Sequence, residues 1–425
     1  MKKEAASKDL NLVLLTEHYP FGDQEAFLEN EVIILSKRFH EIHIYSFAAL
    51  DEKQTRAVPE NVMVERVRKS SGMHLTDSLI LLTKSGIEDI AFVTREYKYK
   101  IRHTVSSLIS RYSVAKRCFL PYLLKENPHN TIFYSYWFSH LSYALACYKS
   151  INPKSLCVTR AHRFDNFIDY NSCFMREYII KNIDAIFPIS QKGKREIIEK
   201  MLAFFPNENI VTSVHYLGVQ IADIVNPASS DGTTRIVSCS NIIPIKRLDL
   251  IIQTLSKITM RKIEWIHFGG GRDAEEIMAY AKDLLGHMEN IDYTFMGPVP
   301  HEYIIEYYRS NHVDVMINAS DHEGIPVSVM EAMAAGIICI ARDVGGNSEL
   351  IINGETGILL PENVNAEDIS EQIVRILDMD AAERNRIKLN AIKKVHTDFN
   401  SDSAYDLFID EIYDLFLKKA KAPDK

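Results

Sequence analysis

The sequence has no apolar run of about 20 residues, the length that a helix needs to cross the hydrocarbon core of a membrane. The apolar run near its N-terminus is too short for a signal peptide. Basic residues are fewer than acidic ones: 49 Lys and Arg residues against 57 Asp and Glu residues give a formal net charge of −8. Dedicated nucleic-acid binders are usually basic, so we expect a protein that does not bind nucleic acid. The lack of a membrane span and of a signal peptide leads us to expect a cytoplasmic location.

The six cysteines are scattered, and no two of them form a CxxC pair. Cys239 and Cys339 lie inside apolar runs, which indicates buried free thiols in a reducing compartment. No cluster of His, Cys and Asp residues has the spacing of metal ligands, so we predict no metal site. Asp378 and Asp380 form a DxD pattern between two helical runs, and we interpret Asp380 as a helix N-cap.

At 425 residues the chain is too long for one ordinary core and suits two domains of about 200 residues each. Short apolar runs alternate along it with longer amphipathic segments such as 25–37 and 273–285. The short runs predict strands at 12–15, 42–47, 131–136, 156–159, 185–189, 210–215, 235–240, 263–268, 293–296, 313–318, 337–341 and 357–360. Such alternation predicts parallel sheets covered by helices on both faces.

A polar, turn-rich segment at 226–234 separates the two series of predicted strands. We therefore predict an α/β fold of two doubly wound, Rossmann-like domains, 1–218 and 219–400, which face each other across a cleft. The last segment, 401–425, contains a predicted helix at 403–419 with one apolar face. Its pattern leaves open whether it packs on the second domain or returns to the first.

Glycine is unevenly distributed, since six of the 17 glycines precede residue 268 and eleven follow it. Many of these eleven come just after a predicted strand, where glycine lets the backbone approach a ligand closely. Ligands of doubly wound sheets bind at the carboxyl ends of the strands. The second domain is therefore the candidate nucleotide-binding domain.

The most informative segment is NASDHEGIPVSVMEAMAAG at 318–336. It is typical of a strand end, a tight loop and a helix that has Pro326 near its first turn. Free N–H groups at such a helix start attract an anion, for example a diphosphate. Glu323 and Glu331 flank this site, and carboxylates are better partners for sugar hydroxyls than for phosphate. Spacing alone leaves open that both glutamates are ordinary surface residues.

This segment resembles the signature of two glutamates separated by seven residues in retaining GT-B glycosyltransferases, in particular glycosyltransferase family 4. The resemblance extends over IARDVGGNSELIINGETGILL at 340–360 and FMGPVP at 295–300. It implies that Glu331 binds the ribose hydroxyls of a sugar nucleotide and that Glu323 holds the transferred sugar.

The resemblance also implies further donor contacts. The N–H groups of Ile325 and Val327, in the loop that contains Gly324, would bind the phosphates, and the turn of Pro298 and Val299 would lie against the base. The turn FGGGRD at 268–273 lacks the GxGxxG pattern of a dinucleotide site and resembles the family's pocket-lining turn. We expect Gly269 and Gly271 to line the nucleotide pocket.

The segment SCSNIIPIKRLD at 238–249 resembles the family's other phosphate-binding element. Lys246 would neutralise the diphosphate as its bond to the sugar breaks, which is electrostatic stabilisation of the transition state. The family commonly has an arginine at the position of Asn241. Either Asn241 or Arg247 could take its place, and the sequence leaves that choice open.

In the first domain, YPFGDQEAFLENE at 19–31 resembles the family loop that reaches the donor phosphates and the acceptor. The residue carried over from it is Gly22, although the family often has two adjacent glycines there. The segment TRAHRFD at 159–165 follows a predicted strand, and its His162 matches a family histidine near the transferred sugar. A lone histidine is otherwise more often structural.

The segment 61–126 carries twelve Lys or Arg residues against six Asp or Glu residues. One interpretation is a patch that docks on the anionic inner face of the cell membrane. The other is a set of helices with solvated basic faces.

We therefore predict a hexosyltransferase-type glycosyltransferase without a cofactor, in which His162, Lys246 and Glu323 act in catalysis. It would move a sugar with retention from a UDP- or GDP-linked donor to a saccharide or lipid-linked saccharide, in bacterial surface polysaccharide synthesis. The leaving phosphate would help to deprotonate the attacking hydroxyl. Alternatives are a sugar-nucleotide epimerase or phosphorylase of the same fold, a silent sugar-nucleotide sensor or scaffold, and a dinucleotide-dependent oxidoreductase.

Overall fold

The computed structural model of the chain describes residues 9–22, 24, 25, 27–68, 75–97, 101–162, 165, 175–220, 226–229 and 231–421. Residue contacts divide the chain into two compact units. Unit 1 contains Met1–Tyr216 together with Asp402–Lys425, and unit 2 contains Leu217–Ser401. Unit 1 is therefore discontinuous in sequence, whereas unit 2 is one continuous stretch.

Unit 1 is built on a seven-stranded parallel sheet of order β3-β2-β1-β4-β5-β6-β7. Its strands are β1 (Asn11–Thr16), β2 (Ile42–Ser46), β3 (Val62–Arg66), β4 (Thr131–Ser135), β5 (Leu156–Ala161), β6 (Ala185–Pro188) and β7 (Val211–Thr212). All six strands predicted for this half overlap strands of the structure, and β3 was not predicted.

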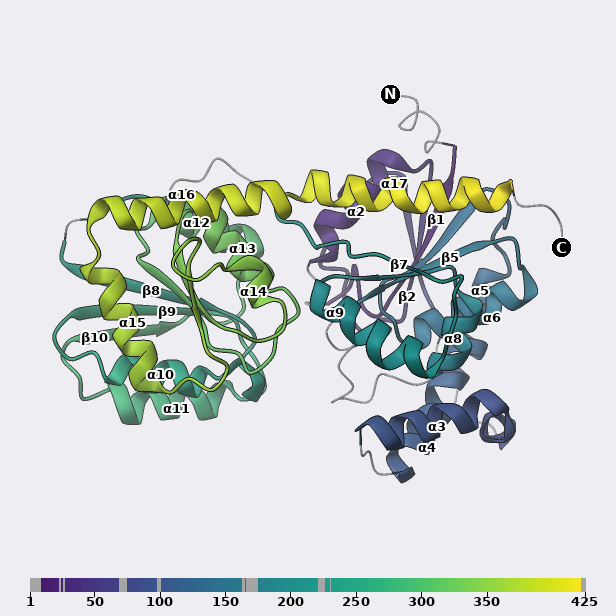
Figure 1. Cartoon of the computed structure of the whole chain (residues 1–425), viewed down its shortest axis with the longest axis horizontal. Helices are drawn as coiled ribbons and strands as arrows, with labels where there is room; N and C mark the ends of the chain where they lie inside the picture. The colour runs from purple at the N-terminus through teal and green to yellow at the C-terminus, as the bar shows by residue number, and fades with distance from the viewer. Residues whose placement is uncertain are drawn as a thin grey trace. The chain divides into compact units, whose positions relative to one another are not determined.

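Helices cover both faces of the sheet in unit 1 (Figure 1). The described helices of this unit are η1 (Leu75–Leu82), α3 (Lys84–Tyr97), α4 (Ile101–Ser113), η2 (Val114–Phe119), α5 (Leu120–Leu123), α6 (His140–Ile151), α8 (Arg176–Asn182), α9 (Gln191–Glu196), η3 (Ile197–Leu202), α2 (Leu28–Arg38) and α17 (Ser401–Ala420). Successive strand residues alternate between the two faces: Leu12 and Leu14 pack with α2 and α17, whereas Val13 and Leu15 pack with the other helices. Both faces are therefore apolar, as in buried parallel sheets.

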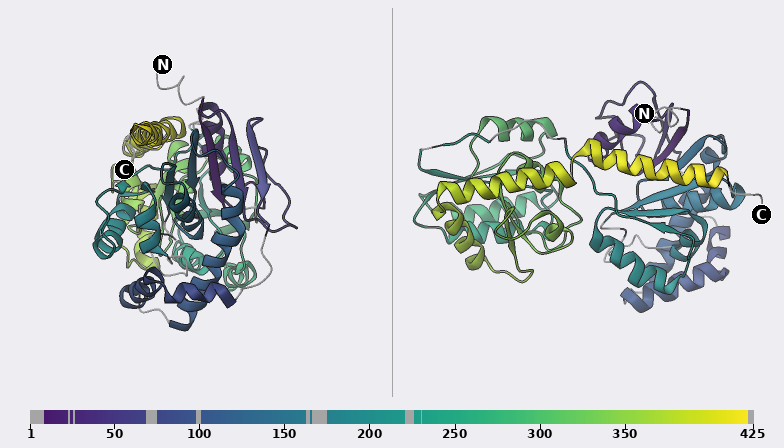
Figure 2. Two further views of the ribbon diagram at one scale, coloured as in Figure 1. Left: turned by 90° about the vertical axis from the view of Figure 1, so that its right-hand side faces the viewer. Right: turned by 45° about the horizontal axis from the view of Figure 1, so that its top comes forward.

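The helix α17 belongs to the core of unit 1, although it follows unit 2 in the sequence (Figure 1 and Figure 2). Its residues Tyr405, Phe408, Ile409 and Ile412 are fully buried in the same cluster as Leu12 of β1. Unit 1 is therefore completed by the C-terminal end of the chain.

Unit 2 has a six-stranded parallel sheet of order β10-β9-β8-β11-β12-β13. Its strands are β8 (Thr233–Cys239), β9 (Lys262–Phe268), β10 (Ile291–Phe295), β11 (Val315–Asn318), β12 (Ile338–Arg342) and β13 (Ile358–Leu360). The helices around it are η4 (Pro244–Lys246), α10 (Leu248–Ser256), α11 (Ala274–Leu285), α12 (His301–Ser310), α13 (Val327–Ala334), α14 (Asn347–Leu350), α15 (Ala366–Asp378) and α16 (Ala381–Asp398). Every strand predicted for this half overlaps one of these six, so the predicted pair of parallel α/β sheets is confirmed.

The structure confirms the predicted helix cap at Asp380 and the burial of most of the described cysteines. The side chain of Asp380 accepts a hydrogen bond from the backbone N–H of Glu383 at 2.8 Å, so its predicted role as a helix N-cap is confirmed. Within the described residues, Cys118, Cys147, Cys157 and Cys339 are buried and outside any disulfide, whereas Cys239, which was predicted to be buried, is half-buried. The sixth, Cys173, lies outside the described residues.

Candidate active site

The loop after β11 holds the carboxylate of Glu323 in a set of hydrogen bonds. One of its oxygens accepts from Ser320 Oγ at 2.6 Å, from Asn318 Nδ2 at 3.0 Å and from Lys246 Nζ at 2.6 Å. Burial alone would raise the pKa of Glu323, but the Lys246 ammonium and these hydrogen bonds lower it below its ordinary value. The side chain is therefore an oriented, ionised carboxylate.

The loop after β8 brings Lys246 to this carboxylate. Pro244–Lys246 forms the short 3₁₀ helix η4, and Arg247 follows it with a left-handed φ of 51°. The side chain of Lys246 keeps 21% of its surface exposed, whereas that of Glu323 keeps 7%. Two residues that the sequence assigned to the same site, 77 positions apart, are thus in direct contact.

Arg247 is directed to other partners. Its guanidinium donates to Asp249 at 3.0 Å and to Asp321 at 3.1 Å, and Asp321 also accepts from Arg342. Asn241, the other candidate for the missing arginine, is exposed. The positive charge of Arg247 is therefore compensated by two carboxylates, and Lys246 is the cation that contacts Glu323.

The helix α13 begins directly after this loop, with Pro326 as its N-cap residue. The N–H groups of Val329 and Met330 both donate to the carbonyl of Pro326, so Val327 and Ser328 precede the first intrahelical bonds. No side chain among the described residues caps this helix start. Its N–H groups and its dipole are thus available to an anion.

Glu331 lies in the second turn of α13 and is 8% exposed. Its Oε1 atom lies 2.7 Å from Nε2 of His301, the first residue of α12, two positions after the half-buried Val299. Burial and the charge of Glu331 raise the pKa of Cys239 at the end of β8 to about 12, whereas the charge of Lys246 lowers it. Glu331 and Lys246 are therefore both close to the end of β8. The sequence prediction missed His301, although it directly follows the predicted turn at 295–300.

A turn of two glycines supports the Glu323 loop from behind. A Cβ atom on Gly345, whose φ is 57°, would lie 1.7 Å from the carbonyl oxygen of Glu323. The N–H of Gly346 donates to the carbonyl of Gly324 at 2.6 Å, and a Cβ atom on Gly346 would lie 2.5 Å from Cγ1 of Ile325. Backbone packing thus sets the position of Glu323, Gly324 and Ile325.

The glycine residues in the turn after β9 are likewise required by close contacts with neighbouring backbone. A Cβ atom on Gly269 would lie 2.0 Å from the carbonyl oxygen of Ser240, and one on Gly271 would lie 2.2 Å from that of Ile242. Gly270, between them, faces the ring of Pro298, whose Cγ would be 2.8 Å from an added Cβ. These glycines let the loops after β8, β9 and β10 approach one another.

The two candidates in the first half belong to unit 1. The ring of His162 is buried with its centroid 4.6 Å from those of Tyr136 and Trp137. Burial and the charge of Arg160 lower its pKa to about 3, so the imidazole is neutral at pH 7. Its Nε2 has no hydrogen-bond partner in the part of the chain that the structure describes.

Gly22 lies in the turn after β1 with a φ of 60°. Its N–H donates to the carbonyl of Lys53 at 3.0 Å, and its own carbonyl accepts from Arg56 Nη1 at 2.9 Å. The turn is thus tied to the segment before β3.

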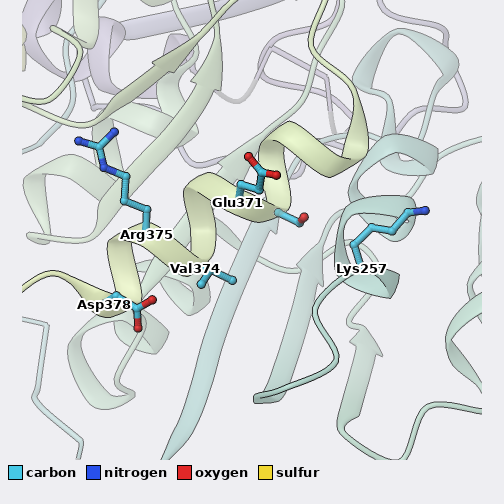
Figure 3. A pocket seen from close by; sticks show the side chains of 6 residues that line it. Lys257, Glu371, Val374, Arg375 and Asp378 are labelled. Carbon is cyan, nitrogen blue, oxygen red and sulfur yellow. The ribbon is translucent and has the colours of Figure 1, made fainter.

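A shallow pocket of about 520 Å³ lies elsewhere on unit 2 (Figure 3). It is lined by Lys257, Ser370, Glu371, Val374, Arg375 and Asp378, mostly from α15. Lys257 pairs with Glu367 at 2.7 Å. None of the predicted site residues lines this pocket, so we assign it no part in the candidate site.

The described residues contain neither a candidate metal-ion cluster nor a helix that could cross a bilayer. No three His, Cys, Asp or Glu side chains in this part of the chain are grouped so that they could bind a metal ion. None of its helices combines the length and apolar character needed to span a bilayer.

Residues 220–394 match the family described as glycosyl transferases group 1. N-acetyl-alpha-D-glucosaminyl L-malate synthase of Bacillus anthracis is 25% identical over 218 residues, 49% of this chain and 55% of that protein. Poly(ribitol-phosphate) alpha-N-acetylglucosaminyltransferase of Staphylococcus aureus (strain COL) is 25% identical over 271 residues, 60% of this chain and 51% of that protein. The chain thus spans about half the length of these two curated relatives.

Solved structures extend the likeness to both units. The apo form of the lipopolysaccharide outer core galactosyltransferase WaaB is 16% identical, with a TM-score of 0.67, and the match covers 96% of this chain and 100% of that one. Anabaena HepE in complex with UDP is 15% identical, with a TM-score of 0.63, over 95% of this chain and 100% of that one. Residues 220–394 are therefore similar to the glycosyl transferases group 1 domain, and the chain has the GT-B fold.

Proposed function

We propose that the protein is a glycosyltransferase that binds a nucleoside-diphosphate sugar in unit 2 and transfers the sugar to a saccharide or lipid-linked saccharide. The observation that carries this proposal is the contact of Lys246 with Glu323 beside the uncapped start of α13. A cation, an oriented carboxylate and free N–H groups together suit a ligand that has a diphosphate and sugar hydroxyls. The names of the relatives support a role in bacterial surface polysaccharide synthesis.

Each group has a distinct proposed task. Lys246 and the N–H groups of Ile325 and Val327 bind the diphosphate, and Glu323 accepts hydrogen bonds from hydroxyls of the transferred sugar. Glu331, oriented by His301, accepts from the ribose hydroxyls. Glu323 compensates the charge of Lys246, and a bound diphosphate would share that ammonium.

We propose that the reaction retains the anomeric configuration, as in the enzymes that the signature resembles. The bond between the anomeric carbon and the phosphate oxygen breaks, and the acceptor oxygen bonds to the same face of that carbon. The leaving phosphate takes the proton of the acceptor hydroxyl. Lys246 stabilises the negative charge that develops on the phosphate, a contribution often worth several kcal/mol.

The test is calorimetric titration with UDP, GDP and ADP and their sugar conjugates. We expect one nucleotide to bind with micromolar affinity, and Glu331→Gln to weaken its binding about tenfold, the loss of roughly one charged hydrogen bond. Glu302→Gln, a change of an exposed glutamate on α12, is the matched control and should leave binding unchanged.

Other outcomes would redirect the proposal. If no nucleotide binds, or if both variants behave alike, the donor site is wrong. Binding without turnover would favour a sensor, and conversion of the donor to an epimeric sugar nucleotide without acceptor would favour an epimerase.

We also propose that the helices after β3 contact an anionic membrane surface. Leu79 and Leu82 of η1 are 58% and 77% exposed, and Ile87 of α3 is 57% exposed. The exposed Lys84 lies between them in sequence. Exposed apolar side chains beside a lysine favour a surface that inserts between lipid headgroups, and this lysine also pairs with Glu88 at 3.6 Å.

A further inference from the structure

The turn after β1 binds a carboxylate of its own chain. Three consecutive backbone N–H groups donate to Glu25: those of Glu17 at 3.2 Å, His18 at 2.7 Å and Tyr19 at 2.6 Å. Glu25 is 6% exposed and has a left-handed φ of 56°. Successive N–H groups that converge in this way form an anion-binding nest. In this structure the anion is a side chain.

A fourth donor joins the nest from the neighbouring strand. The indole Nε1 of Trp137, just after β4, donates to the same carboxylate. Trp137 is half-buried, and its ring centroid lies 4.6 Å from that of His162, just after β5. Since β1, β4 and β5 are adjacent in the sheet, Glu25 connects the carboxyl ends of β1 and β4 and holds the indole that packs on His162.

Two further carboxyl groups, those of Glu17 and Asp165, lie near the nest, together with Arg111 and Arg176. Burial and the nearby Glu25 raise the pKa of Glu17 to about 7, although Arg111 opposes this shift. Burial likewise raises the pKa of Asp165 to about 6, although Arg176 opposes it. Arg176 donates to the backbone carbonyl of Asp165 at 2.9 Å. An added phosphate or carboxylate would meet these carboxyl groups and a nest that is already filled.

We propose that Glu25 is a positioning residue that fills this nest and fixes Trp137 beside His162, so that unit 1 binds a neutral sugar and not a phosphorylated or acidic one. This inference rests on the proposed function: with the donor bound in unit 2, we assign the acceptor to unit 1. An aromatic face with carboxylates suits the apolar face and the hydroxyls of a sugar. Phosphate recognition instead needs free N–H groups or cations.

The fluorescence of Trp137 offers a direct test. The chain has two tryptophans, and the other, Trp265, is fully buried in unit 2. The fluorescence that is lost in the Trp137→Phe variant therefore comes from Trp137 and reports on the nest. The probes are methyl glucoside and N-acetylglucosamine, each compared with its 6-phosphate. The variants are Glu25→Gln and Glu25→Asp, and the matched control is Glu29→Gln, which removes a carboxylate that pairs with Arg56 at 3.8 Å.

We expect at least one neutral sugar to change Trp137 fluorescence and to bind about tenfold more tightly than its 6-phosphate. Glu25→Gln should shift the Trp137 emission to longer wavelength and weaken neutral-sugar binding about tenfold, whereas Glu25→Asp should recover part of both, since it keeps the charge. Glu29→Gln should match the wild type. Near-ultraviolet circular dichroism identifies a variant that has simply unfolded.

Three results would overturn the inference: tighter or equal binding of the 6-phosphates, a Glu25→Gln variant that behaves like Glu29→Gln, or no response of Trp137 to any neutral sugar. Titration of the same samples with UDP, GDP and ADP separates this failure from that of the proposed function. If one nucleotide binds and any of the three results appears, the inference alone fails. If no nucleotide binds, the donor site in unit 2 fails instead.

Discussion

At the scale of single residues, the candidate site depends on side chains that are partnered across long stretches of sequence. Lys246 and Glu323 were both predicted, and the structure shows that they contact each other directly. Arg247 was a candidate for a phosphate contact, yet Asp249 and Asp321 hold its guanidinium. A sequence pattern can indicate that a cation is present, but only the folded neighbourhood shows which carboxylate compensates it.

Gly345 offers a prediction at this scale. We expect Gly345→Ala to destabilise unit 2 by at least about 2 kcal/mol and to reduce nucleotide binding, because the new Cβ would lie 1.7 Å from the carbonyl oxygen of Glu323. The control is Gly354→Ala, whose φ is 73° but whose added Cβ has nothing within 4 Å. It should cost only backbone strain, about 1 kcal/mol. Urea denaturation with and without UDP measures the stability and the nucleotide binding of each variant. Equal losses of stability in the two variants would contradict a close contact at Gly345.

At the scale of secondary structure elements, the apolar pattern of α17 predicted a helix but not its location. In the structure, the ring of Phe408 lies 5.3 Å from those of Tyr134 and Phe187. The guanidinium of Arg160, which is paired with Glu31 in the buried core, lies 4.4 Å from the Phe408 ring. This helix therefore covers a buried ion pair that would otherwise be open to water on that side.

We expect Phe408→Ala to destabilise unit 1 by about 3–5 kcal/mol, the cost of a large cavity in a packed core. Leu407→Ala is the matched control, since Leu407 is 66% exposed on the same helix, and it should change stability by less than about 0.5 kcal/mol. Chemical denaturation followed by circular dichroism gives both values. Similar stabilities for the two variants would show that α17 is not part of the core.

The strand that the sequence analysis missed, β3, shows the limit of local patterns. It lies at the edge of the sheet, where Val62 is buried but Met63 is 49% exposed. Its five residues end in Glu65 and Arg66 and fall within the basic segment. A short edge strand with few buried side chains has little apolar periodicity to detect.

At the scale of the whole molecule, the exposed apolar residues of η1 and α3, together with Lys84, give the proposed membrane contact. We expect the protein to float with vesicles that contain phosphatidylglycerol but not with pure phosphatidylcholine vesicles, and high salt should weaken binding. Leu82→Glu should reduce binding. The control is Leu389→Glu, which changes a 57% exposed leucine in unit 2 and should leave vesicle binding unchanged. Binding to both vesicle types alike, or equal effects of the two changes, would contradict the proposal.

The alternation of apolar and amphipathic segments was enough to predict two parallel α/β sheets, because burial on both faces imposes a local pattern on each strand. The glutamate pair and Lys246 were indicated by their resemblance to a family signature, because spacing alone left open that they are ordinary surface residues. Other features depend on contacts between distant segments and leave no local trace. Among them are His301 at Glu331, Gly345 behind Glu323, α17 in the core of unit 1 and the Glu25 carboxylate in the nest after β1. Only the tertiary structure decides these, because it alone determines which distant groups share a buried environment.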